Sequence, residues 1–123
     1  MIAIPIQEDN KEIVSNLYGN ASHFAMYDPK DNSFEIIENK AKGDGIKTGE
    51  FIIKNGAEQT LYIHLGEGVF NRLIEEDINI FYIGNDEIPL KEAIKLFNEK
   101  RLTRVTQYNA KKYLSSGNCT CRG

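Results

Sequence analysis

Residues 60–70 of this 123-residue chain read Thr-Leu-Tyr-Ile-His-Leu-Gly-Glu-Gly-Val-Phe, which predicts a buried strand, a tight turn and the start of a helix. Apolar residues at positions 61, 63 and 65 alternate with Tyr62 and His64, a pattern typical of a strand that is covered on both faces. Gly66 and Gly68 let the chain turn out of the strand without a Cβ clash. Ligands of open α/β sheets bind at the carboxyl ends of strands, so this turn indicates where a site would lie.

Periodicity places the other elements around this strand. Apolar runs and period-two alternation predict five strands in all, at residues 1–6, 23–28, 33–39, 60–65 and 78–83. Helical spacing predicts three helices: residues 47–55, a second that follows the glycine turn and ends near residues 75–77, and residues 90–100. The turn-forming residues 28–32 join the second and third strands into an antiparallel hairpin.

This order of elements predicts an α/β fold. A hairpin meander followed by βαβ units gives a five-stranded mixed sheet with helices on both faces, a three-layer arrangement. Right-handed crossovers favour the strand order 3-2-1-4-5, with strand 2 antiparallel to the rest. This is the ribonuclease-H-like arrangement, and it brings residues 7–20 and 66–68 to the same edge of the sheet.

Composition and charge divide the chain into a body and a tail. Residues 100–123 carry six basic and no acidic residues, whereas the first 99 residues carry nine basic and all 18 acidic ones, a net charge of −9. We expect one domain over residues 1–102 and a flexible basic tail over residues 103–123. The tail would either dock on an anionic partner or fold back on the acidic body of its own or a neighbouring chain.

Several classes of protein are excluded by the sequence. It has no apolar run near 18 residues and no basic segment followed by a long apolar one, so we expect no membrane span and no signal peptide. Its two cysteines lie within the last five residues, so they cannot form a disulfide framework for the core. We expect a cytoplasmic protein with neither a membrane nor a nucleic-acid partner.

Four stretches resemble one known family. Residues 2–6 are similar to its opening strand, and residues 17–28 resemble its His-Phe-Gly segment and the strand after it. Residues 66–68 and the helix behind them resemble its glycine turn, and residues 89–102 its closing helix. The family is the dinitrogenase iron–molybdenum cofactor biosynthesis family, which includes NifX-like and NafY-like accessory proteins, and the likeness covers nearly all of residues 1–102.

The resemblance implies a ribonuclease-H-like fold and a role in binding, storing or passing an iron–sulfur or iron–molybdenum-type cluster, without catalysis. It also implies a metallocluster donor or acceptor protein as partner. This chain departs from the family pattern at one place, because Leu17 and Tyr18 stand where the family often has His before Phe-Gly. If that His holds a cluster in other members, this chain lacks it.

The candidate cofactor-binding residues lie at the predicted crevice: Tyr18, Gly19, His64, Gly66 and Gly68. Gly19 is predicted to have a positive φ or to allow a close approach of backbone. His64 is either a ligand or proton carrier or a hydrogen-bonded core residue, and the core interpretation is preferred because one His without a paired group is not a site. The same alternatives apply to His23. The glycine turn is either structural or an anion-binding helix end, although Glu67 would repel a phosphate.

The candidate metal ligands are Cys119 and Cys121. Thiolates are soft ligands suited to zinc, copper(I) or iron–sulfur clusters. A complete site needs about four ligands, so the others would come from His23, His64, a second subunit or a partner. The alternative is a tail whose thiols bind nothing specific.

Enzymatic chemistry finds no support in the residues. A nuclease of this fold needs clustered carboxylates for two cations, and the first predicted strand carries none. In the predicted topology we expect no Ser or Cys in a recognisable nucleophile elbow or beside a His. The sequence therefore favours a small non-catalytic carrier or accessory protein. A second copy of this chain is one candidate partner, which would make the protein a homodimer. The alternatives are an interaction or regulatory module whose basic tail docks on an acidic partner and a binder of small anions.

Overall fold

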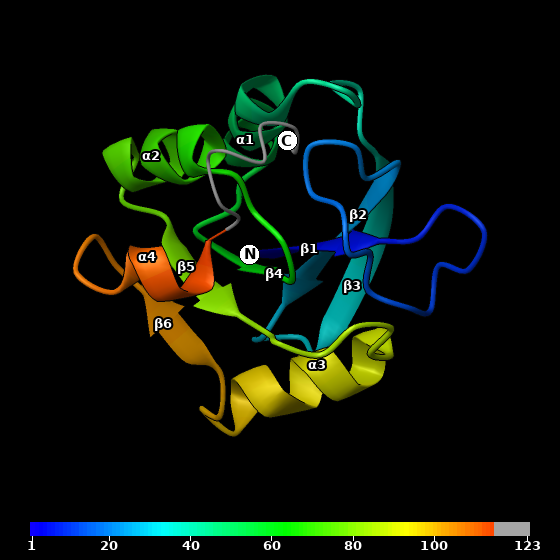
Figure 1. Ribbon diagram of the computed structural model, residues 1–123. Helices are drawn as coiled ribbons and strands as arrows, with labels where there is room; N and C mark the ends of the chain where they lie inside the picture. The colour runs from blue at the N-terminus through cyan, green and yellow to red at the C-terminus, as the bar shows by residue number, and fades with distance from the viewer. Residues whose placement is uncertain (115–123) are drawn as a thin grey trace.

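The computed structural model describes residues 1–114 and shows one mixed sheet between helices (Figure 1). Within this part of the chain the sheet has six strands in the order β3-β2-β1-β4-β5-β6. The strands are β1 (Ile2–Ile6), β2 (His23–Asp28), β3 (Ser33–Glu38), β4 (Gln59–Tyr62), β5 (Asn79–Tyr82) and β6 (Thr103–Val105). The described helices are α1 (Gly45–Lys54), α2 (Glu67–Glu75), α3 (Leu90–Asn98) and α4 (Ala110–Tyr113).

The order of the first five strands is the predicted one. β1 pairs with β4, and β4 with β5, in parallel, whereas β2 is antiparallel to both β1 and β3. β1 is buried along its whole length, as its uninterrupted apolar sequence predicts for a central strand. β4, which was predicted over residues 60–65, ends at Tyr62 rather than at Leu65, earlier than the alternation of its residues suggests.

A sixth strand corrects the predicted five-stranded sheet. Thr103–Val105 pairs antiparallel with β5, opposite residues 80–82. α4 follows it, and the Tyr62 hydroxyl donates a hydrogen bond to the carbonyl oxygen of Tyr113. Residues 103–114, which the sequence assigned to a flexible tail, therefore pack on the sheet. The rest of that tail lies outside the described residues.

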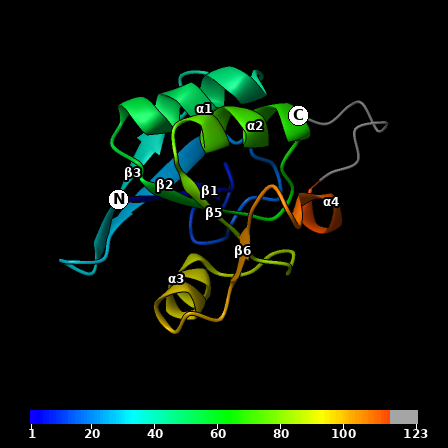
Figure 2. The same ribbon diagram turned by 90° about the vertical axis from the view of Figure 1, so that its left-hand side faces the viewer.

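Two apolar layers hold the helices against opposite faces of the sheet (Figure 2). α1 and α2 pack side by side over one face through buried residues such as Ile52 and Leu73, and residues of α4 join the same layer. α3 covers the other face through Leu90, Ala93 and Ile94. Helices on both faces are thus as predicted, and none of the described helices is long and apolar enough to span a membrane.

Candidate functional site

The loops that follow β1, β4 and β5 meet at one edge of the sheet, which we call the carboxyl edge. It comprises residues 7–22, 39–44, 63–66 and 83–89. The segment 39–44 belongs to it because the Gly43 N–H donates to the Gly19 carbonyl at 2.9 Å. α1 and α2 both begin here, and the side chain of Ile46 lies 3.7 Å from the position that a Cβ on Gly68 would occupy.

Tyr18 is buried below this edge. Its side chain is only 1% exposed, and its ring packs edge-on against Phe24 with centroids 5.2 Å apart. The Thr60 hydroxyl donates to the Ala3 carbonyl at 2.7 Å. Because a hydroxyl has one proton, the hydroxyl of Tyr18 is the donor in its 2.7 Å bond to Thr60 Oγ1. Burial raises the pKa of the Tyr18 hydroxyl, and the phenol offers no accessible atom to a ligand.

Gly19 is a backbone brace. It does not have a positive φ, so of the two predicted alternatives only a close approach of backbone remains, and it is buried. Its carbonyl oxygen accepts from Thr48 Oγ1 at 3.2 Å as well as from Gly43. The buried amide of Asn39 completes this network, since its Nδ2 donates to the Ala21 carbonyl at 2.9 Å and to Thr48 Oγ1 at 3.0 Å. We call residues 15–22 and 39–48 the braced half of the carboxyl edge.

His64 lies in a different environment. Its side chain is 61% exposed, and Nε2 lies 3.9 Å from Oδ1 of Asp86, which is 64% exposed. The preferred interpretation of His64 as a core residue is therefore wrong. We call residues 63–68 and 84–87 the open half of the edge. An ion pair at this distance and exposure adds little stability, so the imidazole is free to meet a ligand.

The amino end of α2 has no cap. Gly66 is the N-cap residue, with φ −77° and ψ 159°, and within residues 1–114 no side chain accepts a hydrogen bond from the first turn. At α1, by contrast, Asp44 Oδ1 accepts from the Lys47 N–H at 3.0 Å. An uncapped helix start carries free N–H groups and a partial positive charge, which suit an anion. The exposed carboxylate of Glu67 in the first turn opposes that attraction.

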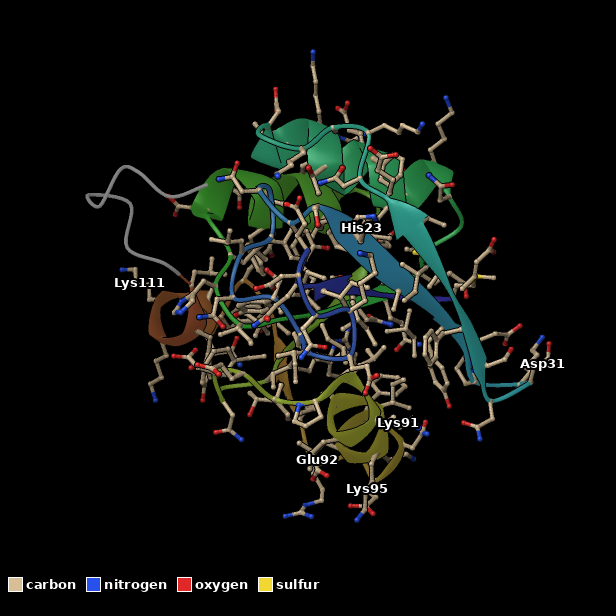
Figure 3. The ribbon with its side chains drawn as sticks, turned by 90° about the vertical axis from the view of Figure 1, so that its right-hand side faces the viewer. His23, Asp31, Lys91, Glu92, Lys95 and Lys111 are labelled. Atoms are coloured by element: carbon tan, nitrogen blue, oxygen red, sulfur yellow. The ribbon has the colours of Figure 1, made fainter. Side chains whose placement is uncertain are left out.

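His23 lies at the same edge but is partly buried. β2 places it opposite Ile6, the last residue of β1, and Figure 3 shows it at the far end of the hairpin from Asp31. Its Nδ1 lies 2.8 Å from the Ser22 hydroxyl, so the expectation that no Ser lies beside a His is wrong. This bond fixes one ring nitrogen, so His23 matches the core interpretation more closely than His64 does.

The structure brings together three of the five predicted crevice residues, His64, Gly66 and Gly68, in the open half of the edge, where His64 and Gly68 are exposed and Gly66 is partly exposed. Tyr18 and Gly19 instead support the fold next to it. Residues 1–114 contain no group of three or more His, Cys, Asp and Glu side chains that could hold a metal ion. Cys119 and Cys121 lie outside the described residues.

Sequence reasoning missed Asp86 as the neighbour of His64. A signal for it existed, because β4 and β5 were predicted to be parallel and adjacent. The loops after two such strands open at the same edge, which places residues 84–86 beside His64.

The fold and the carboxyl edge place this protein among α/β domains that have a mixed sheet, helices on both faces and, in the described residues, a helix without a side-chain cap at the carboxyl edge. The chain belongs to the dinitrogenase iron–molybdenum cofactor family, whose model matches residues 1–100. This match confirms the resemblance to NifX-like and NafY-like proteins. A comparison with curated proteins gave no match.

Solved structures agree on the fold. The apo form of the orange protein from Desulfovibrio gigas superposes with a TM-score of 0.77 at 21% identity, covering 85% of this chain and 92% of that one. A Thermotoga protein of the DUF35 family, proposed to be a NifB protein, gives 0.72 at 25% identity, with coverage of 86% and 93%. A Methanocaldococcus jannaschii protein proposed to be a dinitrogenase gives 0.65 at 17% identity, with coverage of 85% and 93%.

Proposed function

We propose that this protein is a non-catalytic, cytoplasmic carrier or accessory protein. Its cargo is an anionic iron–sulfur or iron–molybdenum-type cluster, received from or passed to a partner protein of cofactor biosynthesis. The strand order is that of the ribonuclease-H-like arrangement, and the family match supports the class of cargo.

The observation that carries this proposal is the uncapped start of α2 beside His64. Free N–H groups at a helix end attract an anion without a dedicated cation. An exposed imidazole two residues earlier supplies a nitrogen ligand for iron or a proton donor to a sulfide. The neighbouring α1, in the same layer, is capped by Asp44, whereas α2 has no side-chain cap among the described residues, which supports the choice of α2 as the helix end that meets the cargo.

The described residues supply only part of a ligand set. His64 lies next to one carboxylate, and no third metal-ligating side chain joins them within residues 1–114. Thiolates are the usual protein ligands of iron–sulfur clusters. We therefore assign thiolate ligation to Cys119 and Cys121 and anion contact to the amides of Gly66 and Gly68. His64 supplies the nitrogen ligand or the proton donor beside them.

The test is anaerobic loading with iron and sulfide and, separately, with extracted iron–molybdenum cofactor, followed by metal analysis and an absorption spectrum. We expect one cluster per chain or per dimer for the wild type. Loading should fall in Cys119→Ser/Cys121→Ser and in His64→Ala. His23→Ala is the matched control, because it removes the same side chain from the same edge at a site already bonded to Ser22.

Loss of loading in the cysteine variant alone would assign the cargo to the tail and remove the edge from the proposal. Equal loss in His64→Ala and His23→Ala would show a general effect on the fold and contradict the edge site. A wild type that binds neither probe would overturn the cluster-carrier function.

A second candidate is an interaction module that docks on an acidic partner. It is favoured by an exposed basic surface at β6 and α4, where Tyr108 is 97% exposed between Arg104 and Lys111. Figure 3 shows Lys111 on α4, away from α3. Docking of this kind weakens with salt, whereas thiolate ligation does not, so the salt dependence of partner binding separates the two functions.

A further inference from the structure

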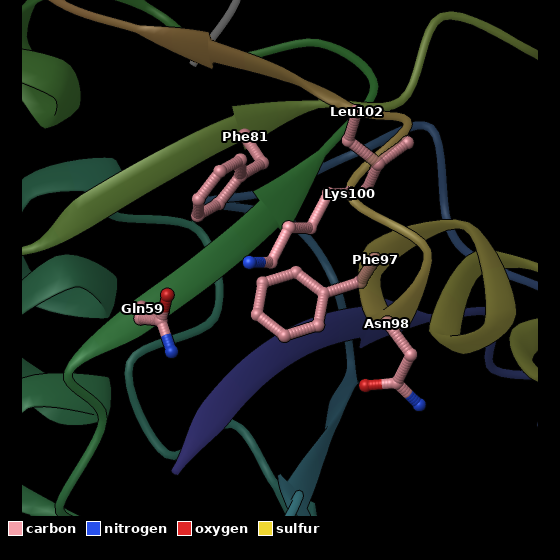
Figure 4. A pocket seen from close by; sticks show the side chains of 6 residues that line it. All are labelled: Gln59, Phe81, Phe97, Asn98, Lys100 and Leu102. Carbon is pink, nitrogen blue, oxygen red and sulfur yellow. The ribbon is translucent and has the colours of Figure 1, made fainter.

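A pocket on the α3 face of the sheet lies away from the carboxyl edge. It occupies about 480 Å³ beside the carboxyl end of α3, where β4 begins. Its lining residues are Gln59, Phe81, Phe97, Asn98, Lys100 and Leu102 (Figure 4). The volume falls within the range of small-molecule sites, which are typically apolar with a few polar groups that orient the ligand.

The apolar part of the pocket is aromatic. The rings of Phe81 and Phe97 lie nearly perpendicular, at 86°, with centroids 5.4 Å apart. Both side chains are partly exposed, as is Leu102. This arrangement leaves ring surface open to a flat guest, which would gain by stacking and by burial of apolar area.

Two polar side chains without partners border this apolar surface. Figure 4 shows Lys100 extending over the pocket, with its ammonium directed toward the side where Gln59 lies. Among residues 1–114, neither side chain forms a hydrogen bond or an ion pair. Asn98 differs, because its Nδ2 donates to the Tyr27 hydroxyl at 3.1 Å. The pocket thus presents one cation and one amide to a guest.

The backbone of Lys100 is strained. α3 ends in a Schellman motif, in which the Lys100 N–H donates to the Phe97 carbonyl and the Arg101 N–H to the Leu96 carbonyl. The motif places residue 100 at φ 59°, in the left-handed region. This region disfavours residues other than Gly, Asn and Asp.

The other long helices end in the same motif with more suitable residues. The equivalent position is Gly56 after α1, with φ 96°, and Asp77 after α2, with φ 58°. A cation stabilises a helix end from any position of the last turn, as Lys95 already does in α3. The helix dipole alone therefore does not require a lysine at the strained position.

We propose that this pocket binds a small aromatic carboxylate. The flat ring lies against Phe81 and Phe97, the carboxylate pairs with the Lys100 ammonium, and the Gln59 amide donates to the second carboxylate oxygen. Strain at Lys100 is retained because it holds the cation over an apolar cavity. The site is separate from the cluster edge, so its test does not depend on the cluster-carrier function.

The experiment compares indole-3-carboxylate with the neutral indole-3-carboxamide, by calorimetry and by amide chemical-shift mapping on the full chain. We expect the carboxylate to bind roughly tenfold more tightly than the carboxamide, with shifts concentrated at Gln59, Phe81 and residues 97–102. In Lys100→Gly the Kd for the carboxylate should rise roughly tenfold, while Tm rises by about 3 °C because the strain is relieved.

Two controls separate strain and charge from binding. Asp77→Gly makes the equivalent substitution at the end of α2, on the other face of the sheet, where Asp already suits the left-handed backbone better than Lys does. It should therefore raise Tm by less than Lys100→Gly does and leave the Kd unchanged. Lys47→Gln removes one positive charge from α1 on the other face and should also leave the Kd unchanged. The proposal is overturned if Lys100→Gly binds as tightly as the wild type, if the two probes bind equally, if the shifts map elsewhere, or if neither probe shows saturable binding.

Discussion

The two halves of the carboxyl edge differ in how the start of a helix is capped and held. Both surround the start of a helix that packs on the same face of the sheet. The braced half closes its helix with Asp44 and links three segments through the buried amide of Asn39. The open half leaves Gly66 without a cap and His64 exposed. One half therefore stabilises the edge, and the other remains available to a ligand.

The largest expected loss of stability comes from a substitution that disrupts the braced half. Asn39→Ala removes the bonds from Nδ2 to the Ala21 carbonyl and to Thr48 Oγ1, and the bond from the Ala41 N–H to Oδ1. Because these groups are buried or partly buried, we expect the free energy of unfolding to fall by about 3 kcal/mol. Urea denaturation measures it. A loss as small as that of an exposed substitution would contradict the brace.

A smaller effect, with a distinct pH dependence, is expected at Tyr18. Burial raises the pKa of its hydroxyl, so the folded chain keeps this proton at a pH where the unfolded chain loses it. The contribution to stability is full below the ordinary tyrosine pKa of about 10 and is lost as pH rises above it.

Tyr18→Phe removes the bond to Thr60 and should lower the free energy of unfolding by about 1 kcal/mol at neutral pH. Its loss of stability between about pH 10 and 11 should be shallower than that of the wild type. Tyr82→Phe, on another part of the sheet, serves as the comparison for general alkaline unfolding. Parallel pH profiles for wild type and Tyr18→Phe would show that Tyr18 does not control this transition.

The smallest expected change in stability comes from a substitution that adds a cap to the helix start in the open half. Gly66 already has the extended backbone of an N-cap, so Gly66→Asp adds a capping carboxylate without strain. We expect a gain of only about 0.5 kcal/mol, measured by thermal unfolding. The affinity for extracted iron–molybdenum cofactor should nevertheless fall, because the carboxylate occupies the free N–H groups and repels an anion.

Asp44→Ala is the counterpart of that variant. It opens the capped end of α1, should cost about 1 kcal/mol, and should leave cofactor affinity unchanged. A second informative variant is Glu67→Gln, which removes the repelling carboxylate and should raise the affinity. If Gly66→Asp binds as tightly as the wild type, the amino end of α2 does not contact the cargo.

The order of strands β1 to β5 was predictable because each carries a clear period and each connection is short enough to restrict the topology. β6 was missed because three residues are too few for a period. Its position depends on pairing with β5, which is a tertiary interaction. Thr103–Val105 therefore read as part of a tail.

The site was less predictable than the fold. The glycine turn and its uncapped helix follow from the sequence Gly-Glu-Gly alone. Alternation in residues 60–65 suggested that His64 continues the strand, but the ladder ends at Tyr62, and His64 turns to solvent. Tyr18 is buried because Thr60 offers its hydroxyl a partner 42 positions away, and no local pattern encodes that contact.

The bond from the Tyr62 hydroxyl to the Tyr113 carbonyl has a consequence for the order in which parts of the molecule open. It joins α4 to the end of β4, 51 positions earlier in the chain. α4 has only four residues, too few to be stable as an isolated helix, so it depends on this bond and on the packing of the Tyr113 ring against Tyr82. Local opening of α4 needs only these few contacts to break, so its amides should exchange hydrogen faster than those of the central strands. The last described helix therefore opens before the sheet does.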